Sequence, residues 1–357
     1  MKKAGLLVGS TVGAMLIVGG GAVFHVLGYP DRKPKGPPAE MKLLVERGMS
    51  LGEIGRRLAD KHILEHPTWF RLWANEQGLA TKIRAGQYTL SSTQTPRQIL
   101  EALVSGAPEE QVSVTIPEGK NLLEVAAILD EAGVSNRDDL VRLMRDPATA
   151  EKLGVPGKTL EGYLFPDTYK LRPGTPALKV LTMLVRRTQA VVAELRSKYP
   201  SDVEKLAKQF KFGDREIVLM ASLVEKETAR PEERPRIAGV FYNRLRLPTF
   251  VPHLLQTDPT IVYGCTVPIE KSAACQKFEG RIRRIHLDDK DNPYSTYAHE
   301  GLPPGPISNP GRDALLAAIK PDTTPYLYFV SKNDGTHYFS KTVAEHEAAV
   351  TKYQRNH

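Results

Sequence analysis

Residues 214–228, DREIVLMASLVEKET, form the most informative stretch of this 357-residue chain. Apolar residues recur there at helical spacing, and the apolar stripe centres near Ile217, Ala221 and Val224. With 3.6 residues per turn, Glu225 and Glu227 lie about 80° to either side of that stripe. The pattern predicts a helix over residues 214–229 that buries one face and carries a carboxyl at each edge of it.

Two interpretations of these carboxyls are open. A carboxyl at the edge of an apolar face loses its hydration when another element covers it, and its pKa then rises toward that of a general acid. Alternatively, both glutamates face solvent and pair with Lys226, Arg230 or Arg215, which periodicity alone favours. Periodicity does not choose between Glu225 and Glu227. Because residues two apart on a helix do not face each other, we expect no cooperating carboxylate pair of the ordinary glycosidase type.

The N-terminal segment is apolar and uncharged between Lys3 and Asp31. It is long enough to cross a hydrocarbon core about 30 Å thick. A cleaved signal peptide is the alternative, but its apolar region is usually shorter and ends in a small-x-small site, which residues 22–24 do not provide. We expect an uncleaved transmembrane anchor over residues 1–29. Basic residues on both sides leave the positive-inside count indecisive, and long C-terminal domains translocate largely regardless of charge.

The pattern of the remaining chain predicts an α+β fold in two domains after a proline-rich linker over residues 30–39. The first domain, residues 40–108, is expected to run strand, helix, helix, strand, helix, with Trp69 and Trp73 in its core. The second domain, residues 109–357, is expected to be irregular after Leu247. Its predicted elements are a strand over 111–116, helices over 121–132, 137–145, 177–197, 214–229 and 313–319, and a strand over 326–330.

Charge and motifs exclude several classes of function. Lys and Arg number 49 against 41 Asp and Glu, a formal charge of +8 spread along the chain, which favours an anionic partner. No phosphate-binding glycine loop, GxSxG, HExxH or CxxC motif occurs, and basic residues are not interleaved with aromatics. We therefore expect no metal, no cofactor and no nucleic-acid partner. The chain's two cysteines, Cys265 and Cys275, could form one bridge in an oxidising compartment.

Five ordered motifs together resemble one known family. They are EGYLFPDTY at 161–169, SLVEKET at 222–228, FYNRL at 241–245, LQTDPT at 255–260 and GLPPGPI at 301–307. This order is similar to that of YceG-like proteins, the MltG-type endolytic murein transglycosylases. The resemblance covers nearly the whole chain, including the single anchor and a small LysM-like domain over residues 40–108.

The resemblance implies a single-pass protein of the bacterial inner membrane with its catalytic part in the periplasm. Such an enzyme cleaves the β-1,4 bond between N-acetylmuramic acid and N-acetylglucosamine within nascent peptidoglycan strands. It leaves 1,6-anhydro ends, needs no cofactor, and has peptidoglycan synthases among its potential partners. The family's catalytic glutamate is the first of its VEKET motif, which implies that Glu225 is the catalytic residue here. One carboxyl suffices, because it first protonates the glycosidic oxygen and then takes the proton of the attacking C6 hydroxyl.

Motif membership also implies roles for six other residues. Glu161 is expected to support the site from behind, and five residues are expected to position the sugars: Asn243, Gln256, Asp258, Tyr294 and Tyr297. The chain departs from the family pattern at Ser295, where the family commonly has the asparagine of YNTY, and it is longer between Leu245 and Gln256.

Two other functions stay open. A non-catalytic wall-binding or scaffold protein would expose Glu225 or block its groove. A hydrolase would need a second carboxylate about 5–10 Å from Glu225, and Asp258 is the residue we would suspect.

Overall fold

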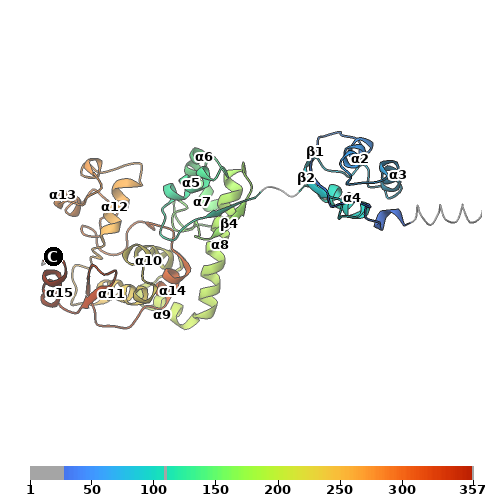
Figure 1. Ribbon diagram of the computed structural model, residues 1–357. Coiled ribbons are helices and arrows are strands. Elements are labelled where there is room, and N and C mark those ends of the chain that lie inside the picture. The colour runs from blue at the N-terminus through green and yellow to red at the C-terminus, as the bar shows by residue number, and fades with distance from the viewer. Residues whose placement is uncertain (1–27, 108–110, 356–357) are drawn as a thin grey trace, which may run out of the picture. The chain divides into compact units, whose positions relative to one another are not determined.

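The computed structural model describes residues 28–107 and 111–355, and the chain divides into two compact units, Met1–Glu110 and Gln111–His357 (Figure 1). The predicted mixed α+β class is confirmed: helices dominate, and the described strands form three two-stranded antiparallel sheets. Residues 1–27 of the expected anchor lie outside the description. Within residues 28–107 and 111–355, no helix has the length and apolar character needed to cross a membrane.

The small unit has the predicted order of elements. A short 3-10 helix, η1 (Tyr29–Asp31), precedes β1 (Glu40–Val45), α2 (Leu51–Asp60), α3 (Pro67–Glu76), β2 (Gly86–Ser91) and α4 (Pro96–Ser105). β1 pairs with β2, and the apolar faces of the helices enclose one core that includes Ile54, Leu58 and Phe70. Trp69 and Trp73 are only partly buried, at the margin of this core.

The first residues of the expected linker pack on the small unit. The side chain of Tyr29 is buried, and its hydroxyl donates to the carbonyl of His66 at 3.0 Å. Asp31 accepts two hydrogen bonds from the guanidinium of Arg97, at 2.7 and 3.0 Å. Residues 29–31 are therefore fixed to the rest of the small unit by these contacts.

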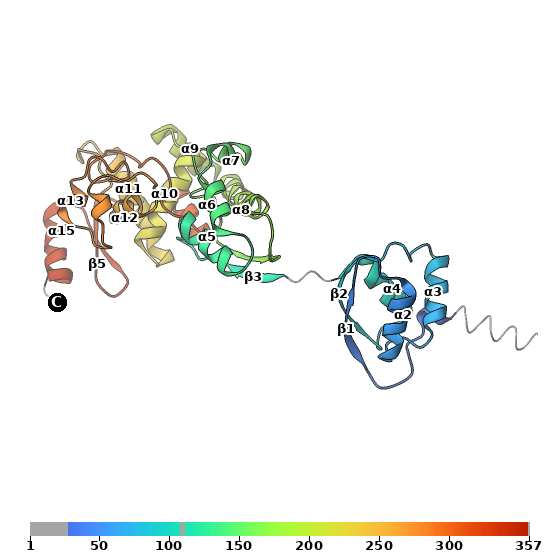
Figure 2. The ribbon, with the colours of Figure 1, turned by 90° about the horizontal axis from the view of Figure 1, so that it is seen from above.

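The larger unit is built around a central helix, α10 (Asp214–Glu227) (Figures 1 and 2). Its other α-helices are α5 (Leu122–Glu131), α6 (Arg137–Met144), α7 (Pro147–Lys152), α8 (Ala177–Lys198), α9 (Pro200–Phe210), α11 (Arg234–Arg246), α12 (Asp258–Thr266), α13 (Arg284–Leu287), α14 (Arg312–Ile319) and α15 (Val343–Val350). Its strands are β3 (Val112–Thr115), β4 (Thr168–Leu171), β5 (Tyr328–Ser331) and β6 (His337–Ser340). Three short helical turns complete it, η2 (Pro231–Glu233), η3 (Cys275–Lys277) and η4 (Thr351–Arg355).

α10 is buried on all sides from Ile217 to Val224, so the expectation of a single buried face is wrong. α11, α12 and α14 all contact it, and even the polar Ser222 is fully buried because its hydroxyl donates to the carbonyl of Leu219 at 2.7 Å. Two of the three helices around α10, namely α11 and α12, were not expected from the sequence. The region after Leu247 also contains a disulfide between Cys265 and Cys275.

Close packing of α11 gives a prediction about Gly239. A Cβ atom at Gly239 would lie 2.5 Å from the backbone carbonyl oxygen of Asp322. We expect Gly239→Ala to lower the free energy of unfolding by about 1–3 kcal/mol, although alanine normally favours a helix over glycine. Urea unfolding measures the change. Gly52→Ala is the control, because its Cβ would make only ordinary contacts, the nearest to Arg71 at 3.6 Å; equal destabilisation of both variants would contradict the prediction.

Candidate active site

Glu225 lies in the last turn of α10 with its side chain only 4% exposed. One carboxylate oxygen, Oε1, accepts a hydrogen bond from Nη2 of Arg234 at 2.7 Å, and the other, Oε2, accepts one from the backbone N–H of Gly311 at 2.9 Å. Lys226 and Arg230 donate instead to backbone carbonyls elsewhere. The structure therefore contradicts, for Glu225, the interpretation in which the glutamate faces solvent and pairs with Lys226, Arg230 or Arg215.

Arg234 is a buried cation shared among carboxylates. Its side chain is 5% exposed, and besides Glu225 it contacts Glu118 at 3.2 Å and Asp313 at 3.8 Å. Burial raises the pKa of Glu225 above its usual value, while the Gly311 N–H and the charge of Arg234 act in the opposite direction and Glu118 adds to the rise. Burial thus favours the protonated form of the carboxyl, whereas Arg234 and Gly311 favour the charged form. Such a balance suits a group that must release and regain a proton.

A cleft of about 460 Å³ opens beside this carboxyl. It is lined by Glu118, Gly119, Glu225, Lys226, Glu227, Thr228, Ala229 and Arg234. Both glutamates of the motif therefore border one cleft, which the helical wheel did not predict. The helix ends at Glu227, and Thr228 has an extended backbone. Helical spacing therefore no longer determines which side the side chains face at this point.

Glu227 is the more deeply buried of the two carboxyls. The hydroxyl of Thr257 donates a hydrogen bond to it, and burial raises its pKa to about 7, with the nearby charge of Asp258 contributing to the rise. At neutral pH a large fraction of Glu227 is therefore protonated.

This burial predicts a pH dependence of stability. Because the pKa of Glu227 rises from 4.5 to about 7 in the folded state, its contribution is fully present below about pH 4.5 and is lost as the pH rises through about 7. Glu227→Gln stays neutral, so we expect the variant to lose up to about 3 kcal/mol less than the native protein between those pH values. Urea unfolding at both pH values measures this difference. An unchanged pH dependence in the variant would contradict it.

Glu161 lies in a layer behind the cleft and is 2% exposed. It accepts hydrogen bonds from the backbone N–H of Leu122 at 3.1 Å, the hydroxyl of Tyr263 at 3.0 Å and the amide of Asn309 at 3.0 Å. Burial raises its pKa to about 7, although the hydrogen bonds from Leu122 and Tyr263 act in the opposite direction. The backbone carbonyl of Asn309 in turn accepts a hydrogen bond from the N–H of Gly119 at 3.0 Å. Glu161 thereby fixes the two loops that border Glu225.

Comparison with known proteins places the chain in a family. The model of the YceG-like family matches residues 43–352. The chain belongs to the YceG-like family. It is 31% identical over 349 residues to an endolytic murein transglycosylase of Bacillus subtilis, with 94% of this chain and 90% of the relative covered. An endolytic murein transglycosylase of Streptococcus pneumoniae is 28% identical over 87% of this chain, which spans 57% of that longer relative.

A solved structure is also similar. The crystal structure of the putative YceG-like protein lmo1499 from Listeria monocytogenes superimposes with a TM-score of 0.54 at 30% identity, covering 88% of this chain and 100% of that one. The resemblance stated from the five motifs is thus confirmed.

Of the residues expected to position sugars in this YceG-like chain, none lines the cleft. Asn243 is buried, and its amide nitrogen donates to the carbonyls of Thr324 at 2.7 Å and Tyr326 at 2.8 Å. Its side chain therefore fastens the loop before β5 to α11. Tyr294 packs on Tyr263, with ring centroids 4.8 Å apart, and lines a different cavity of about 710 Å³.

The other three lie on the Thr257 side of Glu227. Asp258 is exposed and accepts a hydrogen bond from the hydroxyl of Tyr297 at 2.7 Å. Gln256 is exposed, with a positive φ of 50°. Their roles toward sugar stay predictions.

Most of the residues around Glu225 were not predicted from the sequence. Arg234 follows a proline- and charge-rich stretch with no helical signal of its own. Gly311 lies in the proline-rich segment that ends near residue 311, and Glu118 follows the first strand of the larger unit. Within residues 28–107 and 111–355, no group of three or more His, Cys, Asp and Glu side chains could hold a metal ion.

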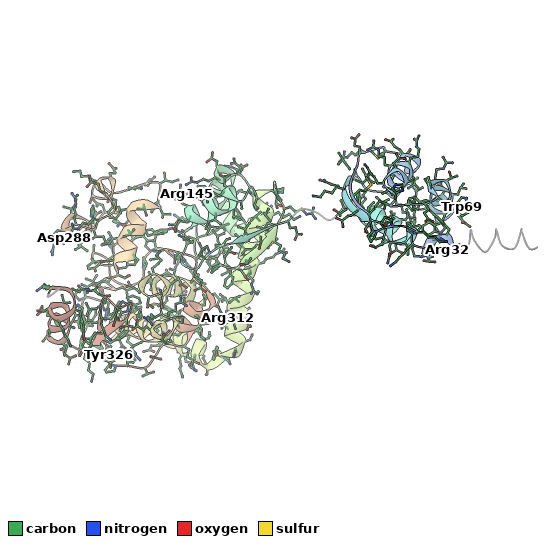
Figure 3. All side chains as sticks on the ribbon, in the orientation of Figure 1. Arg32, Trp69, Arg145, Asp288, Arg312 and Tyr326 are labelled. Atoms are coloured by element: carbon green, nitrogen blue, oxygen red, sulfur yellow. A yellow bond between two sulfur atoms is a disulfide. The ribbon has the colours of Figure 1, made fainter. Side chains whose placement is uncertain are left out.

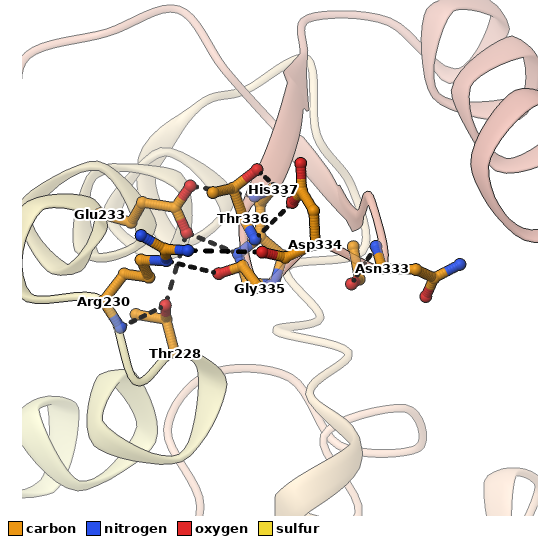
Figure 4. A network of polar contacts seen from close by, with 9 residues as sticks. Thr228, Arg230, Glu233, Asn333, Asp334, Gly335, Thr336 and His337 are labelled. Atoms are coloured by element: carbon orange, nitrogen blue, oxygen red, sulfur yellow. Dashed lines mark hydrogen bonds and ion pairs between the residues drawn. The ribbon is translucent and has the colours of Figure 1, made fainter.

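The end of α10 is fastened to the β5–β6 hairpin (Figure 4). The guanidinium of Arg230 donates to the carbonyls of Gly335 at 3.2 Å and Asp334 at 3.4 Å. Glu233 accepts from the backbone N–H of His337 at 2.9 Å and from the hydroxyl of Thr228 at 3.4 Å. The YceG-like chain thereby holds in place the residues that immediately follow Glu227 in the cleft.

Proposed function

We propose that this protein is an endolytic murein transglycosylase that cleaves the β-1,4 bond between N-acetylmuramic acid and N-acetylglucosamine within peptidoglycan strands. The observation that carries the proposal is the buried carboxyl of Glu225, which borders an open cleft and is oriented by Arg234 and Gly311. The names of the relatives from Bacillus subtilis and Streptococcus pneumoniae support the same substrate.

In the proposed mechanism, Glu225 acts as acid and then as base. Its raised pKa lets the carboxyl protonate the glycosidic oxygen, which becomes the hydroxyl of the departing N-acetylglucosamine. The carboxylate then accepts the proton of the C6 hydroxyl of muramic acid, whose oxygen bonds to C1 and closes the 1,6-anhydro ring. No water is consumed, and the intramolecular attack supplies a high effective concentration of nucleophile.

Arg234 and Gly311 orient the Glu225 carboxyl in both steps of the proposed reaction. Each carboxylate oxygen has a second lone pair beyond the one that accepts their hydrogen bonds, so a proton can be carried without breaking either contact. The positive charge of Arg234 stabilises the carboxylate after it has given up its proton.

We further propose that residues 1–29 anchor the protein in the bacterial inner membrane with both units in the periplasm. The uncharged apolar stretch between Lys3 and Asp31 and the Cys265–Cys275 disulfide support this location. The small unit would be a LysM-like glycan-binding domain, and peptidoglycan synthases would be partners. Fusions of a periplasm-dependent reporter enzyme to the C-terminus test the orientation; activity only with a cytoplasmic reporter would overturn it.

The reaction is tested by digesting uncross-linked glycan strands in water enriched in heavy oxygen and identifying the products by mass spectrometry. Transglycosylation gives internal fragments that end in 1,6-anhydromuramic acid and carry no heavy oxygen. Reducing ends labelled with heavy oxygen would instead show hydrolysis, for which Glu118 and Glu227, rather than Asp258, are the other carboxyls that line the cleft. Strands bound but left intact would favour the non-catalytic wall-binding alternative.

A further inference from the structure

The small unit carries an aromatic cleft at the margin of its core. The cleft has a volume of about 300 Å³ and is lined by Tyr29, Pro30, Trp69, Leu72, Trp73, Glu76, Gln77 and Arg97. Leu72 is 58% exposed, although it lies on the same helix as the fully buried Phe70. α3 therefore presents one face to the core and an apolar, aromatic face to the outside.

The aromatic rings of this face form a connected group at the start of the unit. The Tyr29 and Trp69 rings meet edge to face, with centroids 5.8 Å apart, and the guanidinium of Arg97 lies over the ring of Trp73 at 5.5 Å. Figure 3 shows Trp69 and Arg32 on the same side of the small unit. Tyr29 and Pro30 line the cleft themselves, so the face begins two residues after the apolar N-terminal segment.

We propose that this aromatic face, formed by Trp69, Leu72 and Trp73 beside the buried Tyr29, rests in the headgroup layer of a phospholipid bilayer. Tryptophan and tyrosine prefer this layer because their rings are apolar and carry one polar group. The inference rests on the proposed anchor, since the apolar segment that would enter the bilayer ends at residue 28 and η1 is fixed to the unit by the Asp31–Arg97 pair.

Charge supports a lipid as the occupant. Residues 28–107 contain 12 Lys and Arg against 8 Asp and Glu, a net charge of +4. Arg32, Lys33 and Lys35 follow Tyr29 after Pro30 and Asp31. Anionic phospholipids attract such basic residues by about 1 kcal/mol each.

The experiment uses the full chain, because Trp69 and Trp73 are its only tryptophans and their fluorescence reports on this face alone. The chain is inserted into vesicles of phosphatidylcholine and phosphatidylglycerol, with or without bromine on the acyl chains near the headgroup. We expect brominated lipid to remove most of the tryptophan emission. Trp69→Phe and Trp73→Phe then show that each remaining ring is quenched.

Leu72→Asp is expected to restore much of the emission, because it places a charge in the apolar contact. Leu44→Asp on β1 is the matched control, since Leu44 is a similarly exposed leucine, at 55%, that does not line the cleft; it should leave the quenching unchanged. Failure of the native chain to float with vesicles would overturn both the anchor and this inference. Flotation without quenching would overturn the inference alone, as would a change of tryptophan emission on adding glycan fragments in place of brominated lipid.

Discussion

Glu225→Gln is expected to lower the rate of glycan-strand cleavage by about 10²–10⁴-fold, the usual contribution of a positioned general acid or base. Glutamine has nearly the same shape, but it can neither give a proton to the glycosidic oxygen nor accept one from the C6 hydroxyl. The rate is followed by chromatography of 1,6-anhydro products from uncross-linked strands. Binding of the strands by the variant, measured separately, should persist, since the cleft keeps its shape.

Glu227→Gln is the matched control for this variant. Its carboxyl borders the same cleft, and its glutamine can still accept the hydrogen bond from Thr257. We expect Glu227→Gln to retain most of the native rate. If Glu227→Gln were the inactive variant and Glu225→Gln the active one, the proposed assignment of the catalytic carboxyl would be wrong.

Arg234→Leu is expected to lower the free energy of unfolding by about 3–5 kcal/mol, because it leaves the Glu225 carboxylate buried without its cation. Thermal and urea unfolding measure the loss. Arg236→Leu is the control two residues along α11, since Arg236 is 44% exposed and lies 4.0 Å from Asp322. A pair this exposed contributes little, so equal losses in both variants would contradict the prediction.

The same substitution should also move the pH profile of cleavage. Arg234 lowers the pKa of Glu225, so removing its charge raises that pKa, and the alkaline limb of the profile shifts to higher pH. Arg234→Lys retains the charge and should shift the limb less. A limb that stays in place in Arg234→Leu would mean that it reports another group.

Local signals in the sequence predicted most of the small unit. Thr95 and Gln98 form a reciprocal capping box before α4, and in the larger unit Asn121 and Glu124 form one before α5. At Ser50 the hydroxyl accepts from the backbone N–H of Glu53, whose side chain pairs with Arg57 at 2.7 Å. Caps and periodicity are properties of neighbouring residues, so one chain is enough to identify them.

The centre of the larger unit was harder to predict because its helices are buried on all sides. Such helices do not show the alternation of apolar and polar faces by which a helix is identified in a sequence. Residues 237–244 of α11 are buried throughout, including Asn243 and Arg244, so the segment has no polar face that would mark a helix. Asn243 was expected to contact sugar because it belongs to a family motif, and that role stays a prediction. A polar residue inside a buried helix is satisfied by backbone carbonyls far along the chain, which its own motif does not indicate.

The family motif pointed to Glu225 as the proposed catalytic carboxyl, but its partners come from positions remote in sequence. Arg234 is on α11, Glu118 follows β3, and Gly311 precedes α14. Helical periodicity left Glu225 and Glu227 equivalent, and only the tertiary contacts show one paired with Arg234 and the other with Thr257.

The contact between Glu225 and Gly311 also sets an order of events during biosynthesis. A ribosome makes residue 225 well before residue 311. Until the segment that precedes α14 has been made and folded, the Glu225 carboxyl lacks the amide that orients it. In the proposed enzyme, a chain that ends before residue 311 would therefore have an incomplete active site.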